Sequence, residues 1–229
     1  MKDGFIRVAA ATPKAAVADC IFNANETIKL MKEADRRGAK LVVFPELGLT
    51  GYTCGELFLQ NLLLDGAQEA LLAVVKASEL LDVTAVVGLP LMNSGKLYNT
   101  AAVVSHGRVL GLVPKKHIPN YSEFYEKRYF TEGFLEPITI SFHGQEVPFG
   151  MNLLFEADSM PEFKFAVEIC EDLWVAAPPS TAHTAAGALV IANLSASDEV
   201  TGKDSYRRQL VSSQSARLVS GYIYADAGE

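Results

Sequence analysis

Hydrophobic and polar positions along this chain follow two periods, one typical of strands and one typical of helices. The runs KLVVF and VTAVVGLPL carry almost no polar residues, which is typical of strands buried on both faces. The stretch 97–115 reads as a hairpin with His106 and Gly107 at its turn, and 142–157 suggests two more extended pieces. The two apolar runs cover 40–44 and 83–91, and further strands are predicted over 5–11, 163–170, 188–195 and 222–227.

Helical spacing of apolar residues separates these strands. In the first helix Ile21, Ile28 and Met31 share one face, and Gly38 lies where a C-terminal cap is expected. In the second, the apolar stripe continues to Leu80. The helices are predicted over 19–37, 66–82, 178–187 and 204–221.

Alternating strands and helices, with hairpins between some strands, indicate an α/β or α+β chain. A mixed sheet, or a pair of sheets with helices outside, fits this order best. The last predicted strand begins a few residues before Glu229, and such a strand usually has a partner. We therefore expect the chain to be a domain cut from a longer protein.

Composition narrows the possible classes of protein. The chain has 229 residues, of which 49% are hydrophobic and 21% charged, as in ordinary globular proteins. A net charge of −7 argues against a general nucleic-acid role. We find no apolar run of about 18–20 residues for a membrane span and no signal peptide. Three scattered cysteines suggest neither a disulfide framework nor a metal site, so we expect a reducing cytoplasm.

The stretch VVFPELGLTGY places a carboxylate, Glu46, just after a buried strand. In α/β architectures the carboxyl ends of strands line the ligand crevice. Partial desolvation there raises the pKa of a carboxylate and makes it a usable general base near neutrality. The alternative is an exposed glutamate in a turn, and position alone does not separate the two interpretations.

A second candidate is Lys115, which ends the predicted hairpin and precedes an irregular, aromatic segment over 116–135. Paired lysines at a strand end, here Lys115 and Lys116, are usually solvated. If Lys115 points inward, its fixed positive charge would lower the pKa of a thiol and stabilise an oxyanion. His117 is the rival, as an acid or base partner of a cysteine in a papain-type arrangement, although nothing around it favours that chemistry.

The third candidate is Cys170 in FAVEICEDLW, where an alternating strand stops at an acidic turn. A buried cysteine often only fills space. Glu171 and Asp172 would raise the pKa of a neighbouring thiol, so a reactive thiolate would need a compensating cation. This argument pairs Cys170 with a lysine. Cys20, within a helical pattern, and Cys54, in a glycine-rich loop, are interpreted as structural.

The motifs FPE, PKKHIPNYSEFYEKRYF and ICEDLW, in this order and each at a strand end, resemble those of the nitrilase (carbon–nitrogen hydrolase) superfamily. Its members use a glutamate, a lysine and a cysteine in that order, and the resemblance spans nearly the whole chain. LGLTGYTCGELF and ANLSASDEVTGK further resemble the glutaminase domain of glutamine-dependent NAD synthetases. The resemblance implies a nitrilase-like four-layer α-β-β-α sandwich, truncated at the C-terminus because the family sandwich has further strands.

The resemblance also implies roles for individual residues. Glu46 would be the general base, Lys115 the group that stabilises the oxyanion, and Cys170 the nucleophile. Glu126, in FYEKR, matches a supporting glutamate of the family, and no metal is implied. The positions that match glutamine-binding residues of the synthetase subgroup are Tyr121, Ser197 and Lys203.

The implied function is release of ammonia from L-glutamine through a cysteine thioester. Residues 1–229 would form one glutaminase domain without a cofactor. We find no SGGxDS-type pyrophosphatase loop, so a C-terminal synthetase domain, using ATP and Mg²⁺ to amidate deamido-NAD, is expected outside this chain. The resemblance also implies a homo-oligomer that pairs through helices. Two alternatives stay open: a free-standing amidase for an ω-amide or N-carbamoyl compound, and a catalytically silent interaction domain.

Overall fold

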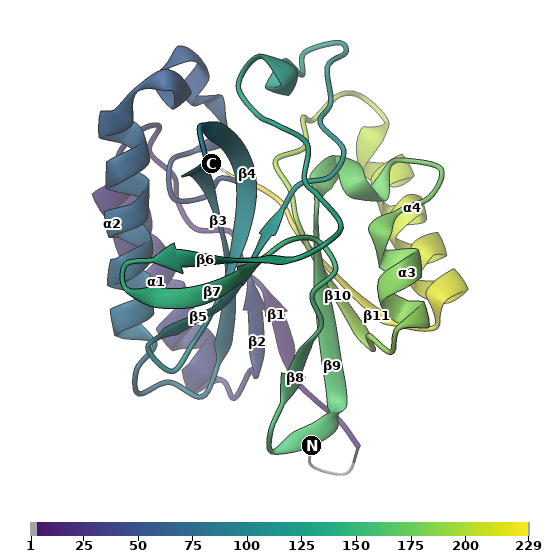
Figure 1. Ribbon diagram of the computed structural model, residues 1–229. Coiled ribbons are helices and arrows are strands. Elements are labelled where there is room, and N and C mark those ends of the chain that lie inside the picture. The colour runs from purple at the N-terminus through teal and green to yellow at the C-terminus, as the bar shows by residue number, and fades with distance from the viewer. Residues whose placement is uncertain (1–3, 229) are drawn as a thin grey trace.

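The computed structural model describes residues 4–228 and contains two β-sheets that pack face to face, with helices on both outer sides (Figure 1). The larger sheet has seven strands, in the spatial order β1 (Val8–Ala10), β2 (Leu41–Val43), β3 (Thr84–Asn93), β4 (Lys96–Ser105), β5 (Arg108–Pro114), β7 (Gln145–Phe149) and β6 (Ile138–Phe142). The smaller sheet has four strands, in the order β11 (Gly221–Ala225), β10 (Val190–Leu194), β9 (Met160–Ile169) and β8 (Phe155–Ala157).

Both sheets are mixed. Strands β1, β2 and β3 are parallel, whereas β3, β4 and β5 form an antiparallel meander. In the smaller sheet β9, β10 and β11 are parallel, and β8 pairs antiparallel with β9. Strands β2, β9 and β10 all have parallel neighbours. The carboxyl ends of parallel strands are where α/β proteins place their ligand crevices.

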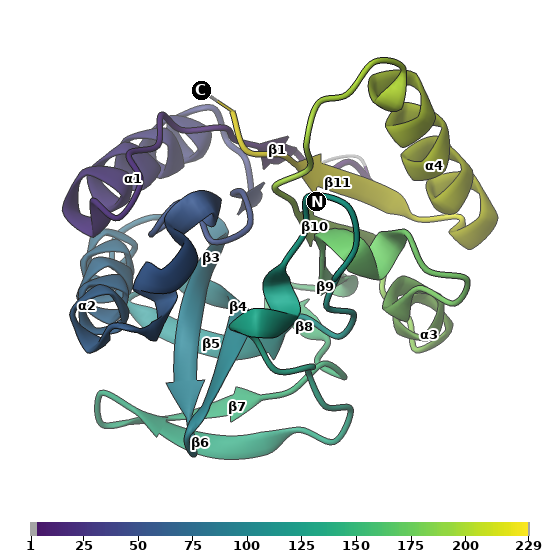
Figure 2. The ribbon, with the colours of Figure 1, turned by 90° about the horizontal axis from the view of Figure 1, so that it is seen from above.

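The helices cover opposite outer faces of the two sheets. Figure 2, seen from above, shows α1 (Cys20–Arg36) and α2 (Asn61–Ala77) on the side of the seven-stranded sheet. On the other side, α3 (Pro179–Ala185) and α4 (Lys203–Leu218) cover the four-stranded sheet. This order of layers is the α-β-β-α sandwich that the family resemblance implied. None of the helices within residues 4–228 is both long enough and apolar enough to cross a membrane.

The continuous apolar strands are explained by burial on both faces. On β2, Leu41 and Val43 point into the core between the sheets, whereas Val42 packs into the core beneath α1 and α2. Successive side chains on a strand alternate between faces, so a strand with helices on one side and a sheet on the other needs apolar residues at every position.

Two predicted helical faces differ from the structure. Ile21 and Leu80 are both highly exposed. Helix α2 begins at Asn61 and ends at Ala77, so Leu80 lies beyond it. The buried face of α1 consists mainly of small side chains, and Gly66 of α2 lies against Cys20, since an added Cβ there would stand 3.6 Å from its Sγ. The close approach of the two helices, and not the position of large apolar residues, therefore determines which face of α1 is buried.

The predicted turns and the last strand are confirmed. Gly38 has a φ of +75° just after α1, as expected for a left-handed C-terminal cap. His106 and Gly107, with φ of 47° and 73°, join β4 to β5. Positive φ at both central residues is the requirement of a type I′ hairpin turn. The strand predicted over 222–227 is β11, which pairs with β10.

Candidate active site

Glu46 lies on a tight turn that follows β2. Gly88 of β3 makes room for that turn: a Cβ at this position would come within 2.5 Å of Leu47 N and 2.7 Å of Pro45 O. The Glu46 backbone N–H donates to Ser195 O at the end of β10, at 3.2 Å. This bond ties the turn to the four-stranded sheet and brings the Glu46 carboxylate to the boundary between the sheets, where it is buried.

Lys115 follows β5 and is completely buried, with 0% exposure. Its ammonium Nζ lies 2.6 Å from Glu46 Oε1 and 2.6 Å from Glu126 Oε1. Glu126 begins a short 3-10 helix, η2 (Glu126–Arg128), in the irregular segment after β5. Lys115 therefore points inward and is not solvated, and Glu46 is not an exposed turn residue.

Two residues that the sequence analysis did not single out complete this cluster. Asn99 of β4 donates from Nδ2 to Glu46 Oε1 at 2.6 Å and to Glu126 Oε2 at 3.3 Å. The hydroxyl of Tyr52 donates to Glu126 Oε1 at 2.8 Å. Asn99 is a polar residue inside an apolar strand, which is a signal that sequence reasoning could have used. Tyr52 gave no such signal.

The cluster holds two carboxylates and one ammonium group away from water. Burial, reinforced by the charge of Glu126, raises the pKa of Glu46 to about 7, although Lys115 and Asn99 act in the opposite direction. Burial alone would lower the pKa of Lys115, but Glu46 and Glu126 together raise it well above its usual value. Lys115 is thus a permanent cation, whereas Glu46 can gain and lose a proton near neutral pH.

Cys170 begins the 3-10 helix η3 (Cys170–Leu173) directly after β9. Its φ of 42° lies in the left-handed region, which is uncommon for a residue with a side chain. Burial and the charge of Glu46 raise the pKa of the thiol far above its usual value, whereas Lys115 and the Ser195 hydroxyl lower it. The thiol is therefore protonated at neutral pH and needs a base.

The end of β10 connects this thiol to the carboxylate cluster. The Ala196 N–H donates to Glu46 Oε2 at 3.1 Å, and the hydroxyl of the preceding Ser195 lowers the pKa of the Cys170 thiol. The charges of Glu46 and Lys115 are also close enough to shift the pKa of that thiol, in opposite directions. The structure therefore gathers the three candidate residues at one place, from the ends of β2, β5 and β9.

A cavity of about 480 Å³ opens beside Cys170. Two pairs of its polar groups bond to each other: the Tyr121 hydroxyl donates to Glu171 Oε2 at 2.9 Å, and the Lys203 ammonium pairs with Asp198. The lining includes all three positions matched to glutamine-binding residues, together with two aromatic rings that flank Lys203 at 5.3 Å. The residues concerned are Tyr121, Ser197, Lys203, Phe124 and Trp174.

Histidine does not take part in this arrangement as far as residues 4–228 are concerned. His117 donates its backbone N–H to Asp172 Oδ1, and the ring of His183 lies 3.2 Å from Met151 O on the α3 side. The groups that act most on the Cys170 thiol are carboxylates, Lys115 and Ser195. The geometry thus favours the glutamate–lysine arrangement over the papain-type alternative.

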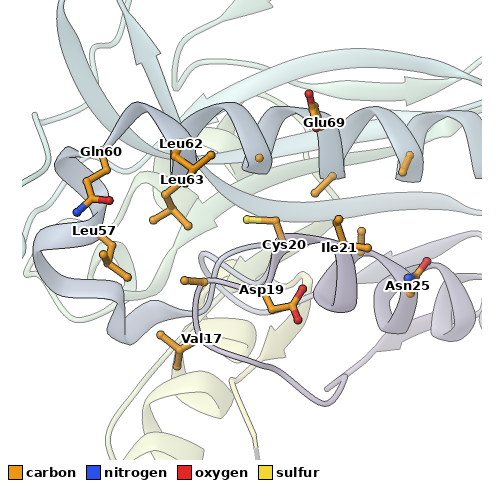
Figure 3. A pocket seen from close by; sticks show the side chains of 15 residues that line it. Val17, Asp19, Cys20, Ile21, Asn25, Leu57, Gln60, Leu62, Leu63 and Glu69 are labelled. Atoms are coloured by element: carbon orange, nitrogen blue, oxygen red, sulfur yellow. The ribbon is translucent and has the colours of Figure 1, made fainter.

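A larger cavity, of about 750 Å³, lies between α1 and α2 (Figure 3). Its wall is largely apolar, with Ile21, Leu62 and Leu63 among its side chains, and it includes the thiol of Cys20. Burial raises the pKa of Cys20 to about 11. No lysine or arginine is among the lining residues of this cavity within the described part of the chain. The smaller cavity, beside Cys170, is therefore the candidate active site.

Comparisons with known proteins agree with this geometry. A family model described as carbon-nitrogen hydrolase matches residues 7–225. A glutamine-dependent NAD(+) synthetase of Mycobacterium tuberculosis is 46% identical over 226 residues, which are 99% of this chain and 33% of that protein. The chain thus spans about a third of the length of the curated relatives it matches.

Solved structures give the same result. A glutamine-dependent NAD(+) synthetase from Cytophaga hutchinsonii superposes with a TM-score of 0.86 at 29% identity, over 97% of this chain and 36% of that one. An amidase from Nesterenkonia sp. shares the fold, with a TM-score of 0.72 at 20% identity over 97% of this chain and 76% of the amidase. The family resemblance found in the sequence is confirmed, and the chain belongs to the carbon–nitrogen hydrolase family.

Proposed function

We propose that this chain is the glutaminase domain of a glutamine-dependent NAD synthetase. The observation that carries the proposal is the buried group of Glu46, Lys115 and Glu126 beside the left-handed Cys170. The names of the relatives support glutamine as the substrate. A protonated thiol, a carboxylate with a pKa near 7 and a permanent cation are the groups needed to cleave an amide through a thioester.

The first step is attack on the side-chain amide of glutamine. Glu46 accepts the thiol proton of Cys170, and the sulfur forms a bond to the amide carbon. The carbonyl oxygen becomes an oxyanion, which Lys115 and backbone N–H groups near Cys170 stabilise. A positioned base contributes about 10²–10⁴-fold to such a reaction and one oxyanion donor about 10²–10³-fold.

The second step breaks the carbon–nitrogen bond. Glu46 returns the proton to the leaving nitrogen, so ammonia departs and a γ-glutamyl thioester remains on Cys170. Glu46 then removes a proton from a water molecule, whose oxygen attacks the thioester carbon. The carbon–sulfur bond breaks, glutamate is released, and Glu46 passes the proton to the sulfur of Cys170. The proposed role of Glu126 is to fix Lys115, since both its oxygens are held by Lys115, Asn99 and Tyr52.

The cavity beside Cys170 would hold the rest of glutamine. Lys203, with its positive charge, suits the α-carboxylate, and Tyr121 and Ser197 supply polar atoms for the remaining groups. Both Lys203 and Tyr121 are paired within the protein, with Asp198 and Glu171. Substrate would take the place of these partners.

The ammonia would serve a synthetase domain that amidates deamido-NAD with ATP and Mg²⁺. This part of the proposal rests on the relatives, of which the chain spans about a third. Cytoplasmic location and assembly as a homo-oligomer are further parts of it.

The decisive experiment is the substitution Cys170→Ala. Release of ammonia from glutamine should fall at least about 10³-fold, because the nucleophile is lost, while glutamine still binds. A variant that releases ammonia at the parent rate would contradict the mechanism. Assays of simple aliphatic amides test the free-standing amidase, which would accept them as readily as glutamine. Selective labelling of Cys170 by a diazoketone analogue of glutamine tests the silent domain, which would not be labelled.

A further inference from the structure

Asp172 is a buried carboxylate near the candidate site that the mechanism above does not use. It lies two residues after Cys170, in η3, with 2% exposure. Its partners are backbone N–H groups. Oδ2 accepts from Ile169 at 3.0 Å and from Lys116 at 3.4 Å, and Oδ1 accepts from His117 at 2.8 Å.

These three donors belong to two separate parts of the site. Ile169 is the last residue of β9 and directly precedes the candidate nucleophile Cys170. Lys116 and His117 directly follow Lys115, beyond the end of β5. One carboxylate therefore joins the backbone of the nucleophile turn, on the four-stranded sheet, to the backbone beside the catalytic cation, on the seven-stranded sheet.

The conformation of Cys170 explains why such a connection matters. A left-handed backbone costs free energy for a residue with a Cβ, and it persists only where the surrounding structure fixes it. The bond from the Ile169 N–H to the Asp172 carboxylate joins the residue just before Cys170 to the residue two positions after it. The backbone is therefore held on both sides of Cys170. Charge-assisted bonds from backbone N–H groups to a carboxylate are among the stronger hydrogen bonds in proteins.

The ionised form of Asp172 suits this task. Burial raises the pKa of Asp172 to about 6, against the effect of its three N–H donors and of the Lys115 charge. At neutral pH the side chain is a carboxylate with only acceptor oxygens, which matches a surrounding of donors.

We propose that Asp172 is a positioning residue that holds the Cys170 turn in its left-handed conformation and at a fixed separation from Lys115. This inference rests on the proposed function, because it concerns the geometry of the same reaction. Asp172 touches neither substrate nor the reacting atoms, and its effect passes through the backbone of Ile169 and of the segment after Lys115.

The test is Asp172→Asn in the full-length protein. An asparagine has the same shape, but its amide group would face one of the N–H donors instead of accepting from it. Misplacement of a reacting group by about 1 Å costs on the order of 10²-fold in rate. We expect kcat for ammonia release to fall about 10²-fold and KM for glutamine to stay within about threefold. Labelling of Cys170 by the diazoketone analogue should slow by a factor similar to that for kcat.

Glu168→Gln is the matched control. Glu168 is an equally buried carboxylate on β9, the strand that leads into η3, but it accepts from the Ser180 N–H at 2.8 Å and from the Tyr222 hydroxyl, on the side of α3 and β11. If the loss of any buried carboxylate were enough to reduce kcat, both variants would lose kcat equally. We expect the parent kcat in Glu168→Gln even if its melting temperature falls.

Three results overturn the proposal: a kcat for Asp172→Asn within twofold of the parent, an equal loss of kcat in Glu168→Gln, or a rise in KM without a fall in kcat. If Asp172→Asn does not fold, Asp172→Glu, which keeps the charge but displaces the acceptor, must give the same division between kcat and KM. An inactive Cys170→Ala alongside a fully active Asp172→Asn would refute only this inference. An active Cys170→Ala would refute the proposed function itself.

Discussion

The two sheets contribute to the candidate site in different ways. The seven-stranded sheet and its loops supply Glu46, Lys115 and Glu126, which are buried and joined by bonds of 2.6 Å. The four-stranded sheet supplies the thiol and one wall of the cavity. On that side Lys203 pairs with an acid, Asp198, that substrate could replace.

The difference that matters is therefore between the buried charged cluster, which takes part in the chemistry, and the cavity wall, which would recognise the substrate. Preorganised charges need no rearrangement at the moment of reaction, which is where electrostatic catalysis gains most. Groups that recognise a ligand must instead exchange one partner for another. We therefore expect substitutions in the buried cluster to reduce kcat and protein stability, and substitutions in the cavity wall to act mainly on KM.

The largest effect is expected for Lys115→Met, because the cation between two buried carboxylates is lost. At pH 8 the free energy of unfolding should fall by about 3–5 kcal/mol, as for other broken buried ion pairs. Ammonia release should fall at least about 10²–10³-fold. Urea unfolding and a rate assay measure the two effects. Lys203→Met is the matched control: a loss of stability there as large as in Lys115→Met would remove the contrast between the two sides.

Glu46→Gln is expected to reduce activity with less damage to the fold. Glutamine keeps the shape and one acceptor oxygen, but it cannot take the thiol proton, so kcat should fall about 10²–10⁴-fold. The comparison is Glu171→Gln, which changes a carboxylate of the cavity wall that bonds to Tyr121. That variant should change KM more than kcat. Equal losses of kcat in both variants would place the base elsewhere.

The pH dependence of kcat/KM should show an acidic limb at about pH 7. Glu46 must be deprotonated to act as a base, and its pKa is raised to about 7 by burial and by the charge of Glu126. Activity should therefore fall about tenfold for each pH unit below 7.

Glu126→Gln sharpens this prediction. Removal of the neighbouring negative charge should lower the pKa of Glu46 and move the limb to lower pH. A limb that stays in place or moves to higher pH would show that another group controls it.

The smallest effect is expected for Tyr52→Phe. The substitution removes one hydrogen bond, of 2.8 Å, to the buried Glu126. The free energy of unfolding should fall by about 1.5–3 kcal/mol, the usual contribution of a hydrogen bond to a charged group. kcat should fall only a few-fold, because Lys115 and Asn99 still hold that carboxylate. Tyr129→Phe removes a bond of 3.4 Å to Glu56 at the surface. It should change neither quantity, as measured by thermal unfolding and rate assays.

Local patterns in the sequence predicted the elements wherever one cause dominated. The apolar runs of β2 and β3 predict buried strands because sheets and helices cover both faces. The hairpin turn at His106 and Gly107 is confirmed because positive φ is a local requirement. The prediction that Ile21 lies on the buried face of α1 was wrong. Gly66 of α2, far along the chain, packs against α1 and determines which face is buried.

The sequence by itself determined the family, through three ordered motifs, and identified Glu46, Lys115 and Cys170 as candidates. It could not distinguish an inward lysine from a solvated one, nor find Tyr52 and Asn99, because burial and hydrogen-bond partners depend on segments distant along the chain. Tertiary structure alone decided that Glu46 and Glu126 share one buried ammonium and that Asp172 joins the two sheets. The physical reason is that pKa values and bond geometry depend on distances in space, which no local pattern specifies.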